Sequence, residues 1–392
     1  MLIKWYKNMM KQTFGVSLFI LETFTLLIPQ ETEAQRRRYK YIMALGVFGK
    51  ICSYVSSGGT TMVHLYFVKK EKIEMDISEH LAVIVSTVGI ITICLAYPMF
   101  SKSWANMLRA LTDYSKFGKP ANVDETTRFC NRVGVVIVVF FFHCVFLYEL
   151  ANLYESKNCF KLNREKHLHL CCLTMFPVWL PHAVSTRDQI LIAAAQIALI
   201  AFAAMPVGVA SLLPWEVSKQ LSNHIRHLNN MFHTIWETDN PEEQRRRLNH
   251  WIEYNFHLTT IIQELNRLTK GCVGIVSLVV SIVLALTLNQ LLNWNKPLAA
   301  IMHLSGWLWS LTTNCITGQK IIDKTESIPV NMWNSNWYKA DIKIVKDVQF
   351  AMLSAQRQFT LTALPLGTLD MPLLLLLLKS SYSYLTLVTN ST

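Results

Sequence analysis

The 392-residue chain is 52% hydrophobic and only 16% charged, and it carries a formal net charge of +11. This composition is typical of a protein that crosses a membrane several times, and it excludes an ordinary soluble domain. The positive charge is explained by the placement of basic residues in alternate loops, described below, so nucleic-acid binding is not expected. The sequence has no Gly-rich phosphate loop, HExxH motif or nucleophile elbow, and we therefore predict no enzymatic activity.

Residues 1–40 are interpreted as a cytosolic N-terminal segment. Three lysines precede an apolar run over residues 13–28, an order that a signal peptide would also show. However, Glu22 interrupts the run, Pro29 ends it, and no small-x-small cleavage site follows. We therefore expect a helix that is retained in the protein, either in the cytosol or at the membrane interface.

Seven apolar stretches of about 20 residues or more follow, each long enough to cross a hydrocarbon core of about 30 Å. They run over Tyr41–Phe67, Ile77–Phe100, Val133–Leu153, Ile190–Leu213, Cys272–Leu292, Leu298–Gly318 and Leu364–Val388. The sequence therefore predicts an all-α fold with seven transmembrane helices.

The basic residues between these stretches predict how the chain is oriented in the membrane. About 25 of them lie in the N-terminal segment and in every second loop after it, against about 8 in the other three loops. Because cytosolic loops carry the excess of Lys and Arg, the N-terminus is expected in the cytosol and the C-terminus outside. A G-protein-coupled receptor has the opposite orientation. The sequon at Asn390 would be extracellular, but it lies so close to the membrane that we expect little glycosylation.

The expected outer loop between the third and fourth spans is rich in potential ligands. Cys159, Cys171 and Cys172 lie in this loop, so one disulfide can form there, although the sequence does not choose the pair. His167 and His169 stand beside two of these cysteines, at a spacing that allows chelation. We predict no metal site, because no second cluster would complete a tetrahedral coordination.

The cytosolic loop at residues 214–270 is predicted to form two helices that continue spans four and five. Its apolar residues recur at helical spacing, and Asp-Asn-Pro at 239–241 interrupts the pattern. The loop could be a solvated connector or a packed region below the membrane. We favour packing, because Trp236, Trp251 and Phe256 present much aromatic surface.

A second cytosolic helix is predicted over Lys339–Arg357, before the last span. Ile342, Val345, Val348 and Leu353 alternate there with charged residues, as an amphipathic helix requires.

Short motifs, most of them in the last third of the sequence, carry a family resemblance. They comprise Cys315 and Gly318, Trp337-Tyr338, Gln356-Arg357, Leu361-Thr362-Ala363, Ser381-Tyr382-Ser383-Tyr384 and, before span four, Phe176-Pro177-x-Trp179-x-Pro181. Together they resemble the insect odorant receptors, and about 70 C-terminal residues carry the specific part of the resemblance. The related gustatory receptors end in a signature with a later Gln-Phe, which this chain lacks, so the odorant branch is favoured.

The resemblance implies a subunit of a non-selective cation channel that odorant opens directly, in the cell membrane of olfactory neurons. Such channels are heterotetramers of a tuning subunit and a shared co-receptor, without a cofactor. Residues 41–213, with part of span six, would form the odorant-binding bundle. Residues 214–270 and 271–363 would form the anchor and spans five and six, and residues 364–392 the pore-lining span. Because the cytosolic loop has only about 57 residues, it resembles a tuning subunit. A metabotropic receptor, a gustatory-type receptor and a transporter are the alternatives.

By position, the resemblance places the ligand in the outer half of the bundle, between spans two, three, four and six. The corresponding residues are Val85, Val88, Phe142, Phe146, Glu149, Trp179, His182, Ile301, Met302 and Ser305. Each of them could instead serve helix packing. An apolar pocket suits a small volatile ligand, because burial of apolar area supplies about 25 cal/mol per Å².

The resemblance also implies a narrow gate in the last turns of span seven, at Tyr384, Leu387 and Ser391. An apolar ring gates by dewetting, so Ser391 departs from the bulky residue expected. Leu387 could instead face lipid.

Two charged residues, Asp370 and Lys50, fall inside the predicted spans. A charge there costs about 2.5–3.5 kcal/mol on insertion scales, so each should face protein or water. Asp370 could lie at the inner mouth of the pore, cap a helix that starts near Thr368, or pair with a cytosolic lysine. Lys50 could reach the inner face or pair across the bundle.

Overall fold

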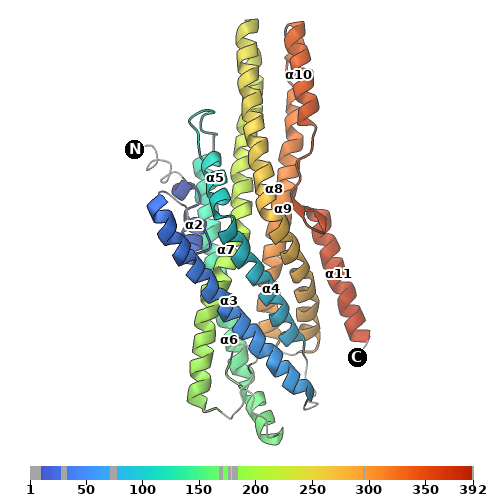
Figure 1. Cartoon of the computed structure of the whole chain (residues 1–392). Helices are drawn as coiled ribbons and strands as arrows, with labels where there is room; N and C mark the ends of the chain where they lie inside the picture. The colour runs from blue at the N-terminus through green and yellow to red at the C-terminus, as the bar shows by residue number, and fades with distance from the viewer. Residues whose placement is uncertain are drawn as a thin grey trace.

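The computed structural model describes residues 10–27, 33–70, 77–166, 171–174, 178, 184–294 and 296–390. It is a bundle of long helices, of which α7, α8 and α9 continue beyond the others as a narrow rod with α10 beside them (Figure 1). The bounds are α2 Gly15–Thr23, α3 Glu33–Lys70, α4 Ser78–Met99, α5 Ser101–Leu111, α6 Val123–Lys166, α7 Thr186–Thr234, η1 Ile235–Glu237, α8 Pro241–Leu292, α9 Pro297–Trp333, η2 Trp337–Lys339, α10 Ile342–Ala355, β1 Thr362–Ala363, β2 Gly367–Thr368 and α11 Met371–Asn390.

The seven predicted spans correspond to α3, α4, α6, α7, α8, α9 and α11. Within the described residues, Ser78–Met99, Val123–Glu165 and Pro241–Leu292 are long and apolar enough to cross a membrane by composition alone. The predicted start of span seven at Leu364 is wrong. Residues 362–368 form the antiparallel hairpin β1–β2, and α11 begins at Met371.

The hairpin lies tightly against α8 and α9, and two glycines make this possible. A Cβ atom at Gly274 would overlap the backbone of Leu364, and one at Gly318 would overlap the carbonyl oxygen of Leu369. The close approach explains why the family motif has a glycine at position 318, since any side chain would push the hairpin away from α9.

The predicted continuation of spans four and five as helices into residues 214–270 is confirmed. Helix α7 runs unbroken to Thr234, and α8 begins at Pro241 after the short turn η1. The Asn240 side chain caps α8 by accepting a hydrogen bond from the Glu242 N–H at 3.0 Å. Pro241 occupies the first turn of α8, where its missing N–H costs nothing.

The rod formed by these extensions has its own aromatic core. Trp251 is 1% exposed, and its indole N–H donates to the Leu228 carbonyl at 3.0 Å. Next to it, His224 Nδ1 and the Tyr254 hydroxyl lie 2.7 Å apart. Burial lowers the pKa of His224 to about 3, so its imidazole is neutral. Phe256, in contrast, is 72% exposed and does not belong to this core.

Helix α10 packs against the rod with a face that matches the prediction only in part. Its buried residues are Ile344, Val348, Met352 and Ala355. Of the predicted residues, Val348 is buried and Val345 is partly buried against the core, whereas Ile342 and Leu353 are 66% and 65% exposed. An apolar face of α10 is thus left uncovered by this chain.

The N-terminal helix α2 lies against α6 and α7, with Leu18 and Leu21 fully buried. Lys50 of α3, itself 1% exposed, donates to the Phe24 carbonyl and to Thr25 Oγ1. Its ammonium group therefore neutralises the C-terminal carbonyls of α2. Lys50 pairs across the bundle, one of the two arrangements expected from the sequence.

Candidate ligand-binding site

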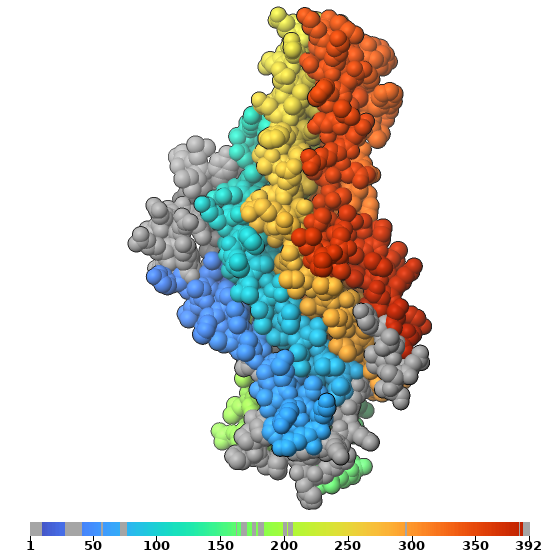
Figure 2. All heavy atoms as spheres, turned by 45° about the vertical axis from the view of Figure 1, so that its right-hand side comes forward, coloured from blue at the N-terminus to red at the C-terminus, as the bar shows by residue number. Residues whose placement is uncertain are grey.

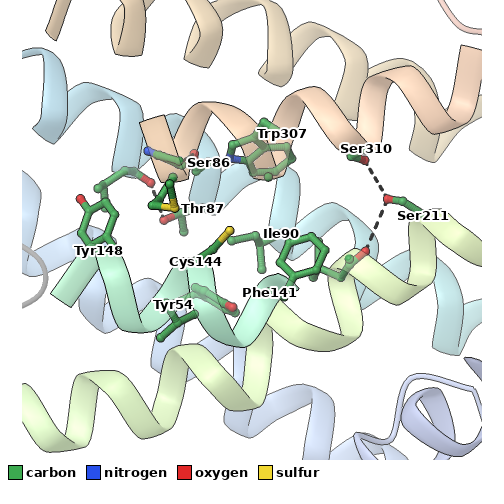
Figure 3. A pocket seen from close by; sticks show the side chains of 17 residues that line it. Tyr54, Ser86, Thr87, Ile90, Phe141, Cys144, Tyr148, Ser211, Trp307 and Ser310 are labelled. Atoms are coloured by element: carbon green, nitrogen blue, oxygen red, sulfur yellow. Dashed lines mark hydrogen bonds between the residues drawn. The ribbon is translucent and has the colours of Figure 1, made fainter. Parts of the chain in front are cut away.

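A pocket of about 150 Å³ lies inside the helix bundle (Figure 3). Helices α3, α4, α6, α7 and α9 all contribute to it. Its lining residues are Tyr54, Val83, Ser86, Thr87, Ile90, Phe141, Cys144, Val145, Tyr148, Val207, Gly208, Ser211, Met302, His303, Gly306, Trp307 and Ser310. The wall is almost entirely apolar, which suits a small uncharged ligand of low polarity.

Two glycines and one aromatic ring shape the pocket. The Phe141 ring lies so close to Gly208 that a Cβ atom there would overlap it. On the opposite helix, a Cβ atom at Gly306 would be 3.6 Å from Phe141, an ordinary contact distance. Gly208 is thus required for the position of Phe141, whereas Gly306 leaves space that a side chain could fill.

The polar groups on the α4–α9 side of the pocket bond to one another. Trp307 Nε1 lies 3.1 Å from His303 Nε2, and Ser86 Oγ lies 2.9 Å from the same nitrogen. An indole N–H can only donate, so His303 Nε2 accepts and the ring proton is on Nδ1. The Ser86 hydroxyl must then also donate to His303.

A buried ion pair is connected to the pocket through Tyr148. The Lys296 ammonium lies 2.9 Å from Glu79 Oε2, and the Glu79 side chain is only 5% exposed. Tyr148 lines the pocket and donates its hydroxyl to Glu79 Oε1 at 3.0 Å. Lys296 lies in the connection between α8 and α9, and Glu79 lies in the first turn of α4. The ion pair therefore joins this connection to the start of α4.

The pocket lies among the four helices predicted to hold the ligand, but most of the predicted residues do not line it. Met302 lines the pocket, and Ser305 lies next to it, with its hydroxyl 3.9 Å from Cys144 Sγ. Glu149 is 8% exposed and Val85 is partly buried, and neither lines the pocket. Trp179 and His182 lie outside the described residues.

The other predicted residues are on outer faces of their helices. Val88, Phe142, Phe146 and Ile301 are 52%, 52%, 65% and 42% exposed. On α6 the displacement is one residue throughout, since Phe141, Val145 and Tyr148 line the pocket in place of 142, 146 and 149. One residue turns a helix by 100°, which is enough to exchange an inner face for an outer one. The contribution of Tyr54 from α3 was not predicted at all.

The residues predicted for the pore lie on or next to α11. Asp370 caps this helix, because its carboxylate accepts from the Leu373 N–H at 2.9 Å and from the Thr368 hydroxyl at 2.8 Å. The capping alternative for Asp370 is therefore observed. Tyr384, Leu387 and Asn390 belong to α11, but their side chains lie outside the described part of the chain, as does Ser391.

A disulfide joins Cys159, near the end of α6, to Cys172 in the connection between α6 and α7. The structure thus selects one of the pairs that the sequence allowed. Cys172 is consequently not free to act as a metal ligand, and His167 and His169 lie outside the described residues. Among the residues that the structure describes, no three His, Cys, Asp or Glu side chains are grouped as metal ligands would be.

A bundle of membrane-crossing helices with an internal apolar pocket defines a membrane receptor or channel. The chain belongs to the 7tm Odorant receptor family, whose sequence model matches residues 75–382. This family and fold indicate a receptor or channel and not an enzyme.

Two solved structures are similar over nearly the whole chain. The insect olfactory receptor OR5 from Machilis hrabei in complex with eugenol has a TM-score of 0.78 at 10% identity, and 99% of this chain and 100% of that chain are covered. A second structure of OR5 from Machilis hrabei gives the same TM-score and the same coverage at 11% identity. The likeness shows that this chain has the seven-transmembrane fold. No curated protein sequence matches the chain significantly.

Proposed function

We propose that this chain is the ligand-binding, tuning subunit of an odorant-gated, non-selective cation channel that it forms with the shared olfactory co-receptor. It would act in the cell membrane of olfactory sensory neurons, in their dendrites. The observation that carries the proposal is the apolar pocket inside a bundle of the odorant receptor family. OR5 of Machilis hrabei binds eugenol, a small aromatic compound, in the same fold. An apolar cavity of about 150 Å³ in another protein is known to hold benzene, so one aromatic ring fits this pocket in size.

The orientation with the N-terminus in the cytosol has support from two independent features. The basic residues predict that the loop between spans three and four is extracellular. That loop contains the disulfide Cys159–Cys172, and disulfides persist on the oxidising, extracellular side. The rod of α7, α8, α9 and α10 then extends into the cytosol.

The position of α11 supports its role in lining a pore shared between subunits. Figure 2 shows the C-terminal segment from α10 to α11 along one edge of the molecule. One side of α11 packs on α8, where Ser381 Oγ donates to the Ser281 carbonyl at 3.0 Å. The other side leaves Leu375, Leu376 and Tyr382 at 58%, 58% and 64% exposure. A helix covered on one side only can face a central axis, and Leu387 and Tyr384 are its proposed gate residues.

The uncovered face of α10 supports assembly with other subunits. Ile342, Phe350 and Leu353 are 66%, 78% and 65% exposed. In the proposed orientation this face is in the cytosol, where no lipid can cover it. Exposed apolar patches of this kind mark protein interaction sites. The cytosolic loop of about 57 residues favours a tuning subunit over the co-receptor.

The test is whole-cell current in cells that express this chain with and without an insect co-receptor, under a panel of volatiles and with G-protein signalling blocked. Fast current only when both subunits are present is the expected result. Current that disappears under the block would instead identify a metabotropic receptor and contradict the proposed orientation.

A surface variant links this test to the structure. Replacing Phe350 and Leu353 by Ser removes apolar surface from the proposed contact, so co-receptor capture and current should both fall at least tenfold. The variant should still fold, because both side chains are exposed in the single chain. Gln349→Ser, on the same helix and also exposed, is the matched control and should change neither. Normal capture by the double variant would show that α10 is not a contact between subunits.

A further inference from the structure

Most polar groups that line the pocket have hydrogen-bond partners within the protein. Ser86 and Trp307 bond to His303, and Tyr148 donates to Glu79. The Thr87 hydroxyl donates to the Val83 carbonyl at 2.9 Å. These side chains therefore have no donor left for a ligand, except for the single proton that His303 carries on Nδ1.

The serine pair at the other end of the pocket is also satisfied. Ser211 Oγ and Ser310 Oγ are 2.7 Å apart, and Ser211 Oγ lies 3.4 Å from the Val207 carbonyl (Figure 3). Ser211 donates to this carbonyl, so Ser310 donates to Ser211, and both protons are used inside the protein.

Tyr54 differs from all of these residues. It lies on α3, lines the pocket and is only 6% exposed. Its hydroxyl oxygen is buried and makes no hydrogen bond to any of the described residues. A buried tyrosine hydroxyl normally finds a partner, and a buried polar group without one costs about 1–3 kcal/mol.

We propose that the Tyr54 hydroxyl donates a hydrogen bond to an acceptor oxygen of the ligand, which makes the pocket selective for small volatile carbonyl compounds over hydrocarbons of the same shape. The inference rests on the proposed function, since it names the ligand class of the same pocket. A carbonyl oxygen suits this site for two reasons. It accepts a hydrogen bond without bringing a donor, and the remaining surface of the compound can be wholly apolar, like the wall.

The size of the pocket makes the preference measurable with simple compounds. Acetophenone and α-methylstyrene have the same shape and differ in a carbonyl oxygen against a methylene group. Benzaldehyde and styrene form a second pair of this kind. Both pairs contain one aromatic ring, the size that a cavity of about 150 Å³ accepts.

The experiment measures binding to the purified full chain, by the concentration of each compound that gives half of its maximal thermal stabilisation. For wild type, we expect the carbonyl member of a pair to act at about tenfold lower concentration than the hydrocarbon. In Tyr54→Phe the two members should become equal, mainly because the hydrocarbon now binds better and the carbonyl worse. Tyr66→Phe is the control, since Tyr66 is on the same helix, 62% exposed and outside the pocket.

The outcomes separate this inference from the proposed function. Equal binding of both members to wild type, or a preference that survives in Tyr54→Phe, would overturn the role of Tyr54 while leaving the pocket as the ligand site. If no compound stabilises the chain although co-receptor-dependent odorant currents are recorded, the ligand site is elsewhere and the inference is overturned with it. If Tyr54→Phe does not fold, Tyr54→Leu and Tyr54→Met replace it in the same comparison.

Discussion

The two ends of the molecule are built from the same long helices and are packed differently. In the rod, α7 and α8 bury Trp251, Phe232 and Tyr254 against each other, and the ring centroids of Phe232 and Trp251 are 5.1 Å apart. In the opposite half, α3, α4, α6, α7 and α9 surround a pocket that glycines 208 and 306 help to line. Dense packing fixes the geometry of a scaffold, whereas binding needs unfilled volume, so the two roles require opposite packing.

The two halves also place their buried polar groups differently. In the rod, the Trp251 indole and His224 Nδ1 each have a partner on the facing helix or its backbone. Both the Trp236 indole nitrogen in the rod and the Tyr54 hydroxyl beside the pocket are buried without a hydrogen bond to the described residues. Of these two groups, the Tyr54 hydroxyl lines a pocket that a ligand can fill.

The largest effect on stability is expected from truncating a buried side chain in the core of the rod. Trp251→Ala removes a buried indole and its hydrogen bond, and should lower the free energy of unfolding by about 3–5 kcal/mol. The measurement is the thermal midpoint of the purified chain, together with the yield of monodisperse protein. Phe256→Ala, at a site that is 72% exposed, is the control and should have little effect. Equal losses in both variants would mean that the rod has no core of its own.

The ion pair between Lys296 and Glu79 should give the next largest effect. Lys296→Met leaves the Glu79 carboxylate buried with only its Tyr148 bond, a loss of about 3 kcal/mol. Adding Glu79→Gln should recover part of this loss, because the double variant no longer buries an unpaired charge. A double-mutant cycle on thermal stability measures the coupling. Strict additivity would show that the pair contributes nothing.

The rod should also make stability depend on pH. An exposed imidazole in the unfolded chain titrates near 6.5, whereas burial lowers the pKa of His224 to about 3, with His227 and His257 nearby adding to the effect. The unfolded state therefore binds a proton first, and stability falls as pH decreases from about 6.5 towards 3. At pH 5 the loss is about 2 kcal/mol, since each pH unit is worth about 1.4. His224→Gln should flatten the decline between pH 7.5 and 5, and an unchanged decline would contradict this assignment.

The smallest change in free energy is expected from filling the pocket. Gly306→Leu adds a side chain where a Cβ atom meets only ordinary contacts, so the fold should persist while ligand potency falls about tenfold, or about 1.4 kcal/mol. Gly271→Leu is the control, because nothing lies within 4 Å of its added Cβ and Gly271 does not line the pocket. Potency that is unaffected by Gly306→Leu would place the ligand elsewhere.

The spans and the rod were predictable from the sequence, because length, apolar runs and the Asp-Asn-Pro break depend on local pattern alone. The inner face of each span was not. Lipid and protein interior are both apolar, so the three consecutive phenylalanines at 140–142 give no signal for which ring faces the pocket. The face of α10 was missed for a similar reason, since its apolar residues lie on two sides.

The polar interactions of the site depend on contacts between distant parts of the chain. Glu79 and Lys296 are 217 residues apart in sequence, as are Ser86 and His303. No local pattern announces such pairs. Tyr54 illustrates the same limit, because only the folded bundle brings α3 to the pocket and leaves its hydroxyl without a protein partner.

The central claim is that ligand occupies the pocket between α3, α4, α6, α7 and α9. The most direct test is photocrosslinking of the chain, assembled with the co-receptor, by a diazirine analogue of an activating volatile, followed by peptide mapping. The predicted adducts are on Phe141, Met302 and Trp307, and unmodified odorant should suppress them. Adducts that are confined to the rod or to the outward residues Phe142 and Phe146, and that unmodified odorant suppresses in the same way, would contradict the account.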